Sequence, residues 1–377
     1  MCLAVICMIF IGGFTRLTHS GLSITEWKPV TGILPPLNEE AWIQEFDQYK
    51  QSPEYLKVNS HIDLAEFKSI FWVEFIHRIA GRVTGILYLL PLVFFLINGA
   101  VRGKDVFIYV GGGVLLIGQG FAGWYMVKSG LASDPHVSHF RLAIHLLLAV
   151  LLYALLFWQL MRSRHPELQS SSRGAQSATW GSHEIATDAI ARRARDPRND
   201  ASRSTLNHYL NLSLLLLLIQ IVFGAFVAGL NAGLVYNEFP LMGETFIPHE
   251  VTLDNISLQS FSEPVFVQFI HRITAYIVMI AIFIACFRGF KMKNSVLSKA
   301  LFYLILALVF QVMLGISTLI YSVPIIIALL HQLGAVIVLS CLLWAKYLVQ
   351  TEICAASSND FLIDRNDTPP QEREYFE

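Results

Sequence analysis

Two six-residue stretches, VEFIHR at residues 73–78 and VQFIHR at residues 267–272, each place a histidine beside an arginine in apolar surroundings. They differ at one position, where Glu74 in the first corresponds to Gln268 in the second. An ionisable side chain inside an apolar segment is costly to bury and usually marks a functional site. A carboxylate three residues before a histidine shares its helix face and can accept a proton, which an amide cannot do. The pattern therefore indicates two related sites with different chemistry.

Two further histidines recur in apolar surroundings, His145 in LAIHLLLAV and His331 in ALLHQLGAV. We expect His77 to pair with His145 and His271 with His331, at matching depths of roughly 8–14 Å from one end of their helices at the usual helical rise. Facing helices of a bundle can present two imidazoles as the axial ligands of an iron porphyrin. Zinc would require a third protein ligand, and no cysteine or second histidine lies within one helical turn of these histidines. The pairs therefore favour haem over a bare metal ion.

Arginines next to these histidines fit haem as well. Arg78 and Arg272 directly follow a histidine of each motif, and Arg82 lies one turn further along. Haem carries two propionates, and a guanidinium group binds a carboxylate with two parallel hydrogen bonds. Long basic side chains also reach from a helix to the membrane surface. For Arg82 both interpretations stay open.

The elements that carry these residues are apolar helices. Of the 377 residues, 54% are hydrophobic and only 15% are charged, whereas soluble domains have about 25% charged residues. The apolar runs reach the length of about 20 residues that a membrane span needs. The net charge of −1 provides no field that would attract nucleic acid. The class is therefore an all-α integral membrane protein, with eight predicted spans whose cores are 1–14, 69–99, 106–127, 140–161, 209–230, 265–287, 297–321 and 325–349.

The first predicted span is shorter than the others, and we expect the printed chain to start inside that helix. The predicted spans form two halves of four. Residues of the first half recur at equal spacing in the second: Gly12, Phe14, Gly21, Leu22 and Glu26 match Gly224, Phe226, Gly233, Leu234 and Glu238, and Gln119 and Gly123 match Gln311 and Gly315. Because four is an even number, both halves enter the membrane in the same direction, which predicts eight transmembrane helices in two parallel-repeat four-helix bundles.

This repeat predicts four regions. They are an N-terminal half at residues 1–164, a polar linker at 165–204, a C-terminal half at 205–350 and a tail at 351–377. The linker is rich in Ser, Ala and Arg and has no apolar period, which is typical of a disordered segment.

The Lys and Arg residues of the loops predict the orientation, because they gather on the cytoplasmic side. Arg102, Lys104 and the run RRARDPR at 192–198 lie in loops on one side, whereas the predicted loop 231–264 has no Lys or Arg. Both termini are then cytoplasmic. Loops 15–66 and 231–264 lie outside, and both histidine pairs lie near the periplasmic side of a bacterial inner membrane.

Taken together, these motifs resemble the haem A synthase family of the alphaproteobacterial and mitochondrial type. The matching stretches are GGFTRLTHSGLSITEWKPVTGILPPLNEEAW at 12–42, FWVEFIHRIAGR at 71–82, GWYMVKSGL at 123–131, RLAIHL at 141–146, AGLNAGLVYNEFPLM at 228–242, FIHR at 269–272 and LLHQLGA at 329–335. The resemblance covers nearly the whole chain except 165–204 and the tail. The cysteine pair of the family's other bacterial type is absent, so the sequence does not support a redox-cysteine mechanism.

The resemblance implies an enzyme that oxidises a ring methyl of haem O to a formyl group, by way of hydroxylated intermediates, to give haem A for cytochrome oxidase. The first half looks like the substrate site, with His77 and His145 flanking haem O and with Arg78 and Arg82 nearby. Glu74 is the candidate catalytic residue, as a general base or as a carboxylate that stabilises positive charge on the substrate.

The second half looks like the site of a haem B cofactor, held by His271 and His331 with Arg272 on a propionate. Implied partners are haem O and a membrane electron acceptor of unknown identity. Haem O synthase, oxidase assembly factors and a second copy of the chain are further candidates.

Three alternative functions remain open at this level. A di-haem b-type electron-transfer cytochrome explains the histidine pairs but gives no reason for a carboxylate in one half only. A haem transporter needs no second, permanently held haem. A structural membrane scaffold explains neither pair.

Overall fold

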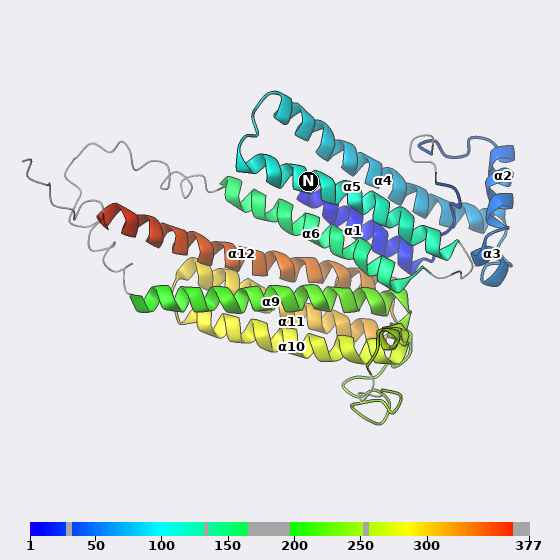
Figure 1. Ribbon diagram of the computed structural model, residues 1–377. Coiled ribbons are helices and arrows are strands. Elements are labelled where there is room, and N and C mark those ends of the chain that lie inside the picture. Colours follow the sequence, from blue (N-terminus) through cyan, green and yellow to red (C-terminus); the bar gives the residue numbers. More distant parts are fainter. Residues whose placement is uncertain (28–31, 132–134, 136, 165–196, 252–255, 365–377) are drawn as a thin grey trace, which may run out of the picture. The chain divides into compact units, whose positions relative to one another are not determined.

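The computed structural model describes residues 1–27, 32–131, 135, 137–164, 197–251 and 256–364, and these residues form helices and loops (Figure 1). In chain order the elements are α1 (Cys2–Leu17), α2 (Glu39–Tyr49), α3 (Pro53–Lys57), α4 (Leu64–Ile97), α5 (Lys104–Gly130), α6 (His139–Arg164), α9 (Pro197–Gly229), η1 (Ala232–Leu234), η2 (Leu258–Ser262), α10 (Pro264–Phe290), α11 (Ser295–Ile320) and α12 (Ile325–Asp364). Within the described ranges, strand-type pairing is limited to an isolated bridge between Met242 and Thr245.

Seven described helices, α4, α5, α6, α9, α10, α11 and α12, are long and apolar enough to cross a membrane, and α1 is a shorter apolar helix. The prediction of an all-α membrane protein is therefore confirmed in this general form. Helix α9 begins at Pro197, so the end of the range predicted as a linker is helical, and α12 continues to Asp364, into the predicted tail. The rest of the predicted linker, residues 165–196, lies outside the described residues.

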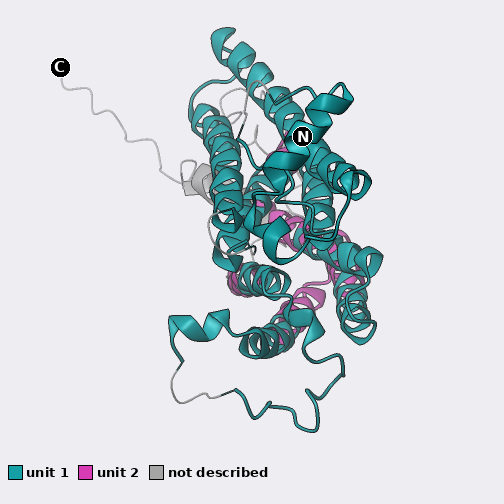
Figure 2. Cartoon of the chain, turned by 90° about the vertical axis from the view of Figure 1, so that its right-hand side faces the viewer, with its two compact units in different colours: residues 1–157, 216–279, 307–339 teal, residues 158–215, 280–306, 340–377 magenta. Residues whose placement is uncertain are grey.

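The chain forms two compact units (Figure 2). Unit 1 consists of Met1–Phe157, Leu216–Met279 and Ala307–Leu339, and unit 2 consists of Trp158–Leu215, Ile280–Leu306 and Ser340–Glu377. Unit 1 takes residues from both predicted halves, so the units do not follow the boundaries that the internal repeat suggests. All the histidines and arginines of the predicted sites lie in unit 1.

Within unit 1, helix α4 packs against α1, α2 and α5. Its first turn is fixed by a capping box. The Asp63 carboxylate accepts the N–H groups of Ala65 and Glu66 at 2.9 Å, and the Glu66 carboxylate accepts the Asp63 N–H at 3.1 Å. Such a cap satisfies N–H groups that have no partner inside the helix. The cap thereby fixes the start of the helix that carries Glu74 and His77.

The ends of α1 and α9, which are equivalent in the repeat, are tied together by Arg16. Its guanidinium group donates to the carbonyl oxygens of Ala228 at 2.8 Å and Gly229 at 3.2 Å, and to Asn231 Oδ1 at 3.2 Å. The two carbonyl oxygens belong to the last turn of α9, where helix carbonyls lack partners within the helix, and Asn231 lies two residues beyond the end of α9. One cation therefore satisfies a helix end and joins the two halves of the sequence within unit 1.

A small helical layer, α2 and α3, lies within residues 15–66, which were predicted only as a loop. Asn38 caps α2 by accepting the Ala41 N–H at 2.8 Å, and Ser52 caps α3 just before Pro53. Both caps are readable signals of a helix start. An aromatic cluster joins this layer to α4, and its buried members are Trp42, Phe46, Tyr49, Phe67 and Phe71.

Unit 2 contains its own polar tie between helices. Lys346 of α12 donates to the side-chain oxygens of Asn207 and Asn211 on α9. Two amide oxygens thus provide neutral acceptors for an ammonium group, which lowers the cost of placing a charge among apolar helices.

The α2–α3 layer yields a prediction about pH and stability. Glu54 is 6% exposed and accepts a hydrogen bond from the Tyr49 hydroxyl at 3.2 Å. Burial raises the pKa of this carboxyl to about 7. Because the folded protein holds this proton more tightly than the unfolded chain, the stability that this group contributes is present at acid pH and is lost as the pH rises through about 7. We expect Glu54→Gln to raise the thermal unfolding temperature at pH 8 more than at pH 5.

The matched control is Glu40→Gln, which removes an exposed carboxyl from α2. Thermal unfolding in detergent between pH 5 and pH 8 measures both variants. A difference between Glu54→Gln and the unsubstituted protein that stays constant with pH would contradict this prediction.

Candidate functional site

The first predicted histidine pair is brought together in unit 1. His77 of α4 and His145 of α6 lie close enough for their charges to interact. Each imidazole lies against a glycine of a neighbouring helix. A Cβ built on Gly12 of α1 would lie 3.5 Å from His77 Nε2, and one built on Gly123 of α5 would lie 3.0 Å from His145 Cε1. Four helices therefore converge on this pair.

The second pair has the same construction. His271 of α10 and His331 of α12 are also close enough for their charges to interact. A Cβ built on Gly224 of α9 would lie 3.3 Å from His271 Cε1, and one built on Gly315 of α11 would lie 2.8 Å from His331 Cε1. Four of the glycines that recur between the two halves, Gly12, Gly123, Gly224 and Gly315, thus let the helices approach each imidazole.

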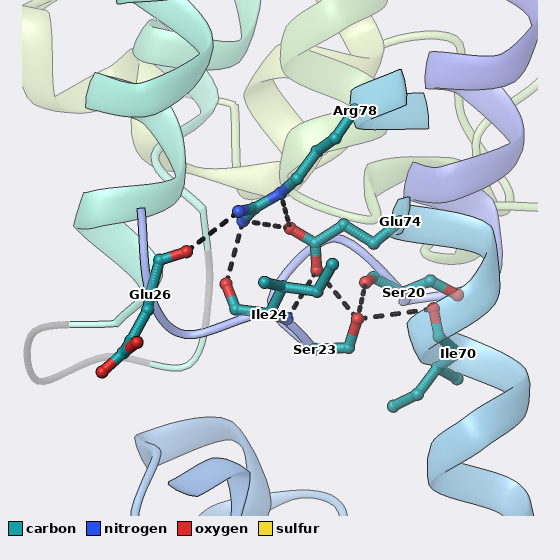
Figure 3. A network of polar contacts seen from close by, with 7 residues as sticks. All are labelled: Ser20, Ser23, Ile24, Glu26, Ile70, Glu74 and Arg78. Carbon is teal, nitrogen blue, oxygen red and sulfur yellow. Dashed lines mark hydrogen bonds and ion pairs between the residues drawn. The ribbon is translucent and has the colours of Figure 1, made fainter. Parts of the chain in front are cut away.

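Glu74 is 3% exposed and lies at the centre of a polar network (Figure 3). Its Oε1 accepts from Arg78 Nη2 at 2.6 Å in an ion pair and from Arg78 Nε at 3.0 Å. Its Oε2 accepts from the Ser23 hydroxyl and from the Ile24 N–H, both at 2.8 Å. A buried carboxylate is stable only with such partners. Glu74 therefore attaches the loop that follows α1 to helix α4.

Arg78 extends this attachment. Its guanidinium group donates to the carbonyl oxygens of Ile24 at 2.9 Å and Glu26 at 3.1 Å, as Figure 3 shows. One cation thus binds its own helix through Glu74 and binds two backbone oxygens of the loop. We name this set of contacts, formed by Arg78 with Ile24 and Glu26, the first loop clamp.

The second half contains the equivalent clamp. Arg272 donates to the carbonyl oxygens of Tyr236 at 3.0 Å, Glu238 at 2.9 Å and Leu241 at 3.0 Å. Tyr236 and Glu238 stand at the same places in the repeat as Ile24 and Glu26. The contacts of Arg272 with residues 236–241 form the second loop clamp.

The clamps differ where the two motifs differ. The Glu74 carboxylate accepts the N–H of Ile24, whereas the amide of Gln268 donates to the carbonyl of Tyr236 at 2.9 Å. Both side chains hold the equivalent loop residue, one through its N–H and the other through its C=O. The sequence predicted Arg78 and Arg272 as haem contacts and did not predict that they bind loop carbonyls. The recurrence of Glu26 as Glu238 was the available signal.

The donor set of these sites fits an iron porphyrin. The four imidazoles are half-buried in apolar helices, so each keeps an accessible part. Arg82 lies on α4 one turn beyond Arg78 and is also half-buried. Over the described part of the chain, no group of three or more His, Cys, Asp or Glu side chains is placed to hold a bare metal ion. Two imidazoles from facing helices are instead a standard axial ligand set for haem iron.

Comparison with known proteins decides the family. The model of a family described as cytochrome oxidase assembly protein, COX15-CtaA, matches residues 1–343. The chain belongs to this family. A protein named heme A synthase from Rickettsia felis is 43% identical over 350 residues, which cover 93% of this chain and 96% of the relative. Proteins of the same name from Rickettsia canadensis and Rickettsia bellii are each 44% identical, with the same shares covered. The resemblance inferred from the sequence motifs is confirmed.

For this member of the COX15-CtaA family, the clamps predict local effects on loop stability. Arg78→Lys keeps the charge but loses the planar group that bonds Glu74 and two carbonyls together. Hydrogen bonds to charged groups contribute about 1.5–3 kcal/mol each. We therefore expect the amides of residues 18–27 to exchange with deuterium at least about tenfold faster. Hydrogen exchange of the purified protein, followed by mass spectrometry, measures this rate.

The matched variant is Arg272→Lys, which should accelerate exchange in residues 231–242 and leave residues 18–27 unchanged. Equal acceleration of both loops by either variant would show that the clamps are not local.

Proposed function

We propose that this chain is a haem A synthase, which oxidises a ring methyl of haem O to the formyl group of haem A for use by cytochrome oxidase. The observation that carries the proposal is the pair of half-buried bis-imidazole sites, built from equivalent helices, in a chain of this family. Relatives that match nearly the whole chain carry the name heme A synthase. The conversion consists of two successive hydroxylations of the methyl carbon and loss of water. It requires a group that accepts protons and a group that accepts electrons.

We propose that the chain forms a repeat of two four-helix bundles, in which α1 is the first of eight membrane helices. The N-terminal half spans residues 1–164 and the C-terminal half residues 205–350, with the linker between them and the tail from 351. The matching glycine–histidine contacts and the matching loop clamps support this repeat. The distribution of Lys and Arg supports an inner-membrane protein with cytoplasmic termini and with both sites near the periplasmic face.

The first half holds the substrate. His77 and His145 flank the iron of haem O, and Arg82 is the nearby cation for a propionate, together with Arg78, which also forms the first loop clamp. Glu74 lies one helical turn from His77 and serves as the proton acceptor for the methyl group that reacts. In the second half Gln268 occupies this place and cannot accept a proton. This difference supports assigning the chemistry to the first half.

The second half holds haem B as a resident cofactor, which supplies one-electron oxidation and reduction chemistry when bound. His271 and His331 would hold its iron, and Arg272, which forms the second loop clamp, would be the nearby cation for a propionate. A membrane electron acceptor completes the reaction. Haem O synthase, oxidase assembly factors and a second copy of the chain are proposed as partners that would receive or deliver the haem.

The assignment of the two halves predicts opposite effects of histidine substitutions. His271→Ala or His331→Ala should remove most of the bound haem B and its low-spin spectrum. His77→Ala should keep that spectrum but stop the formation of haem A. Absorption spectra of the purified variants and chromatography of the extracted haems measure the two effects. A haem B signal that is lost in His77→Ala and kept in His271→Ala would reverse the assignment.

The role of Glu74 is tested by Glu74→Gln, which makes the first motif identical to the second. Gln268 shows that an amide at this place is compatible with a clamped loop, so the fold and the bound haem should survive. A positioned general base contributes about 10²–10⁴-fold in rate, and we expect conversion of haem O to fall by that factor. The ratio of haem O, hydroxylated intermediate and haem A in membranes measures conversion.

Hydrogen exchange of residues 18–27 serves as the control for loop structure in Glu74→Gln. Haem A formed at the unsubstituted rate would show that Glu74 only anchors the loop. Slow conversion together with a loosened loop would also contradict a role as base, provided that Ser23→Ala, which loosens the same loop, slows conversion equally.

A further inference from the structure

Around His271 lies a polar pair that the sequence motifs did not reveal. The amide nitrogen of Gln220, on α9, lies 3.1 Å from His271 Nδ1 and 3.5 Å from Nε2, and it donates to the His271 carbonyl oxygen at 3.0 Å. The hydroxyl of Thr274, one turn along α10, donates to Gln220 Oε1. The same hydroxyl lies 2.8 Å from the Ile270 carbonyl oxygen, so its single proton is shared between the two acceptors. The amide is thus held at both ends, by a histidine and by a hydroxyl.

The first half lacks this pair. The repeat places Met8 where the second half has Gln220, and Ala80 where it has Thr274. The methyl group of Met8 lies 3.6 Å from a Cβ built on Gly81 of α4, so Met8 points at its partner helix as Gln220 does. The same space between the helices is therefore filled by an apolar side chain in one half and by a hydrogen-bonding one in the other.

The other histidine of each pair shows the same difference. His331 Nδ1 lies 3.2 Å from the Gln311 carbonyl oxygen, so both imidazoles of the second half have a partner at Nδ1. His145 Nδ1 is buried without a hydrogen-bond partner among the described residues. The amide nitrogen of Gln119 lies 3.4 Å from His145 Nε2. For His77, no hydrogen bond to the ring is present in the described part of the chain.

We propose that Gln220 is a positioning residue for His271 and that Thr274 fixes the Gln220 amide. Imidazole rings that are fixed by a partner make the second half the site that retains its haem permanently. This inference rests on the proposed function, because it assigns the cofactor to the second half. Histidines that bind a metal through one ring nitrogen usually donate the proton of the other to a fixed acceptor, which fixes the ring and raises its basicity. Rotation of the Gln220 amide exchanges its donor and acceptor and gives up its bond to the His271 carbonyl oxygen. The amide oxygen can then accept the Nδ1 proton when Nε2 binds iron. Thr274 matches either orientation, because a hydroxyl both donates and accepts.

The difference between the halves follows from what each must do. A resident cofactor has to stay bound through every turnover, which requires ligands whose orientation is fixed in advance. A substrate has to enter and its product has to leave, and imidazoles without a partner at Nδ1 are weaker ligands. The Gln220–Thr274 pair therefore distinguishes the site that retains its haem from the site that exchanges it. Glu74 likewise distinguishes the site of the reaction from the site of the cofactor.

The test replaces Gln220 and Thr274 with the residues that stand at the equivalent positions of the first half, Met8 and Ala80. Gln220→Met and Thr274→Ala should weaken the binding of haem B about 10–100-fold, which is the usual cost of removing a partner of a metal-ligating histidine. Titration of the haem-depleted full chain with haemin measures the affinity. The midpoint potential of the bound haem should shift to more positive values in Gln220→Met, because the imidazole loses an acceptor. Gln220→Glu should retain haem and shift the potential to more negative values.

The reciprocal variant Met8→Gln is the matched control, and it should leave the spectrum and potential of haem B unchanged. Unchanged haemin affinity and potential in both Gln220→Met and Gln220→Glu would overturn the inference, provided that His271→Ala still removes the haem B spectrum. If His271→Ala leaves that spectrum intact, the assignment of the cofactor to the second half fails instead. Should Gln220→Met not fold, the more negative potential predicted for Gln220→Glu and the weaker haemin binding predicted for Thr274→Ala decide the question.

Discussion

Each of the four histidines lies against a glycine on a neighbouring helix, and this close approach sets how the helices of unit 1 pack around the two sites. Any larger side chain at Gly123 or Gly315 would place its Cβ within about 3 Å of an imidazole. Because side chains in a packed interior cannot overlap, the glycine and the histidine have to occur together. These glycine–histidine contacts occur at equivalent positions of the repeat in both halves, so one packing rule builds both sites.

On this common frame the halves differ in a few polar side chains. Arg78 and Arg272 hold equivalent loop carbonyls in the same way, which makes the clamps a shared structural device. The carboxylate of Glu74 and the amide of Gln220 each occur in one half only. A proton acceptor near one histidine pair and a ligand-fixing amide near the other are what a substrate site and a cofactor site respectively require.

The loop clamps explain how a residue proposed for chemistry can also be a structural one. Both oxygens of Glu74 are engaged by groups that a carboxylate satisfies well, namely a guanidinium, a hydroxyl and a backbone N–H. In an apolar helix those partners are needed to keep the charge buried. The loop after α1 is consequently attached to the same residue that is proposed to accept the proton.

The sequence by itself determined the membrane class, the family, the histidine pairs and the difference between Glu74 and Gln268, because long apolar runs and repeated motifs are local patterns. It did not determine that Arg78 and Arg272 bind loop carbonyls, that α2 and α3 form a helical layer, or that Gln220 meets His271. These contacts join residues far apart in the chain, and their partners are often backbone atoms, which carry no sequence signal. Only the tertiary structure decided them, because the packing of helices against glycines fixes which polar side chain faces which imidazole.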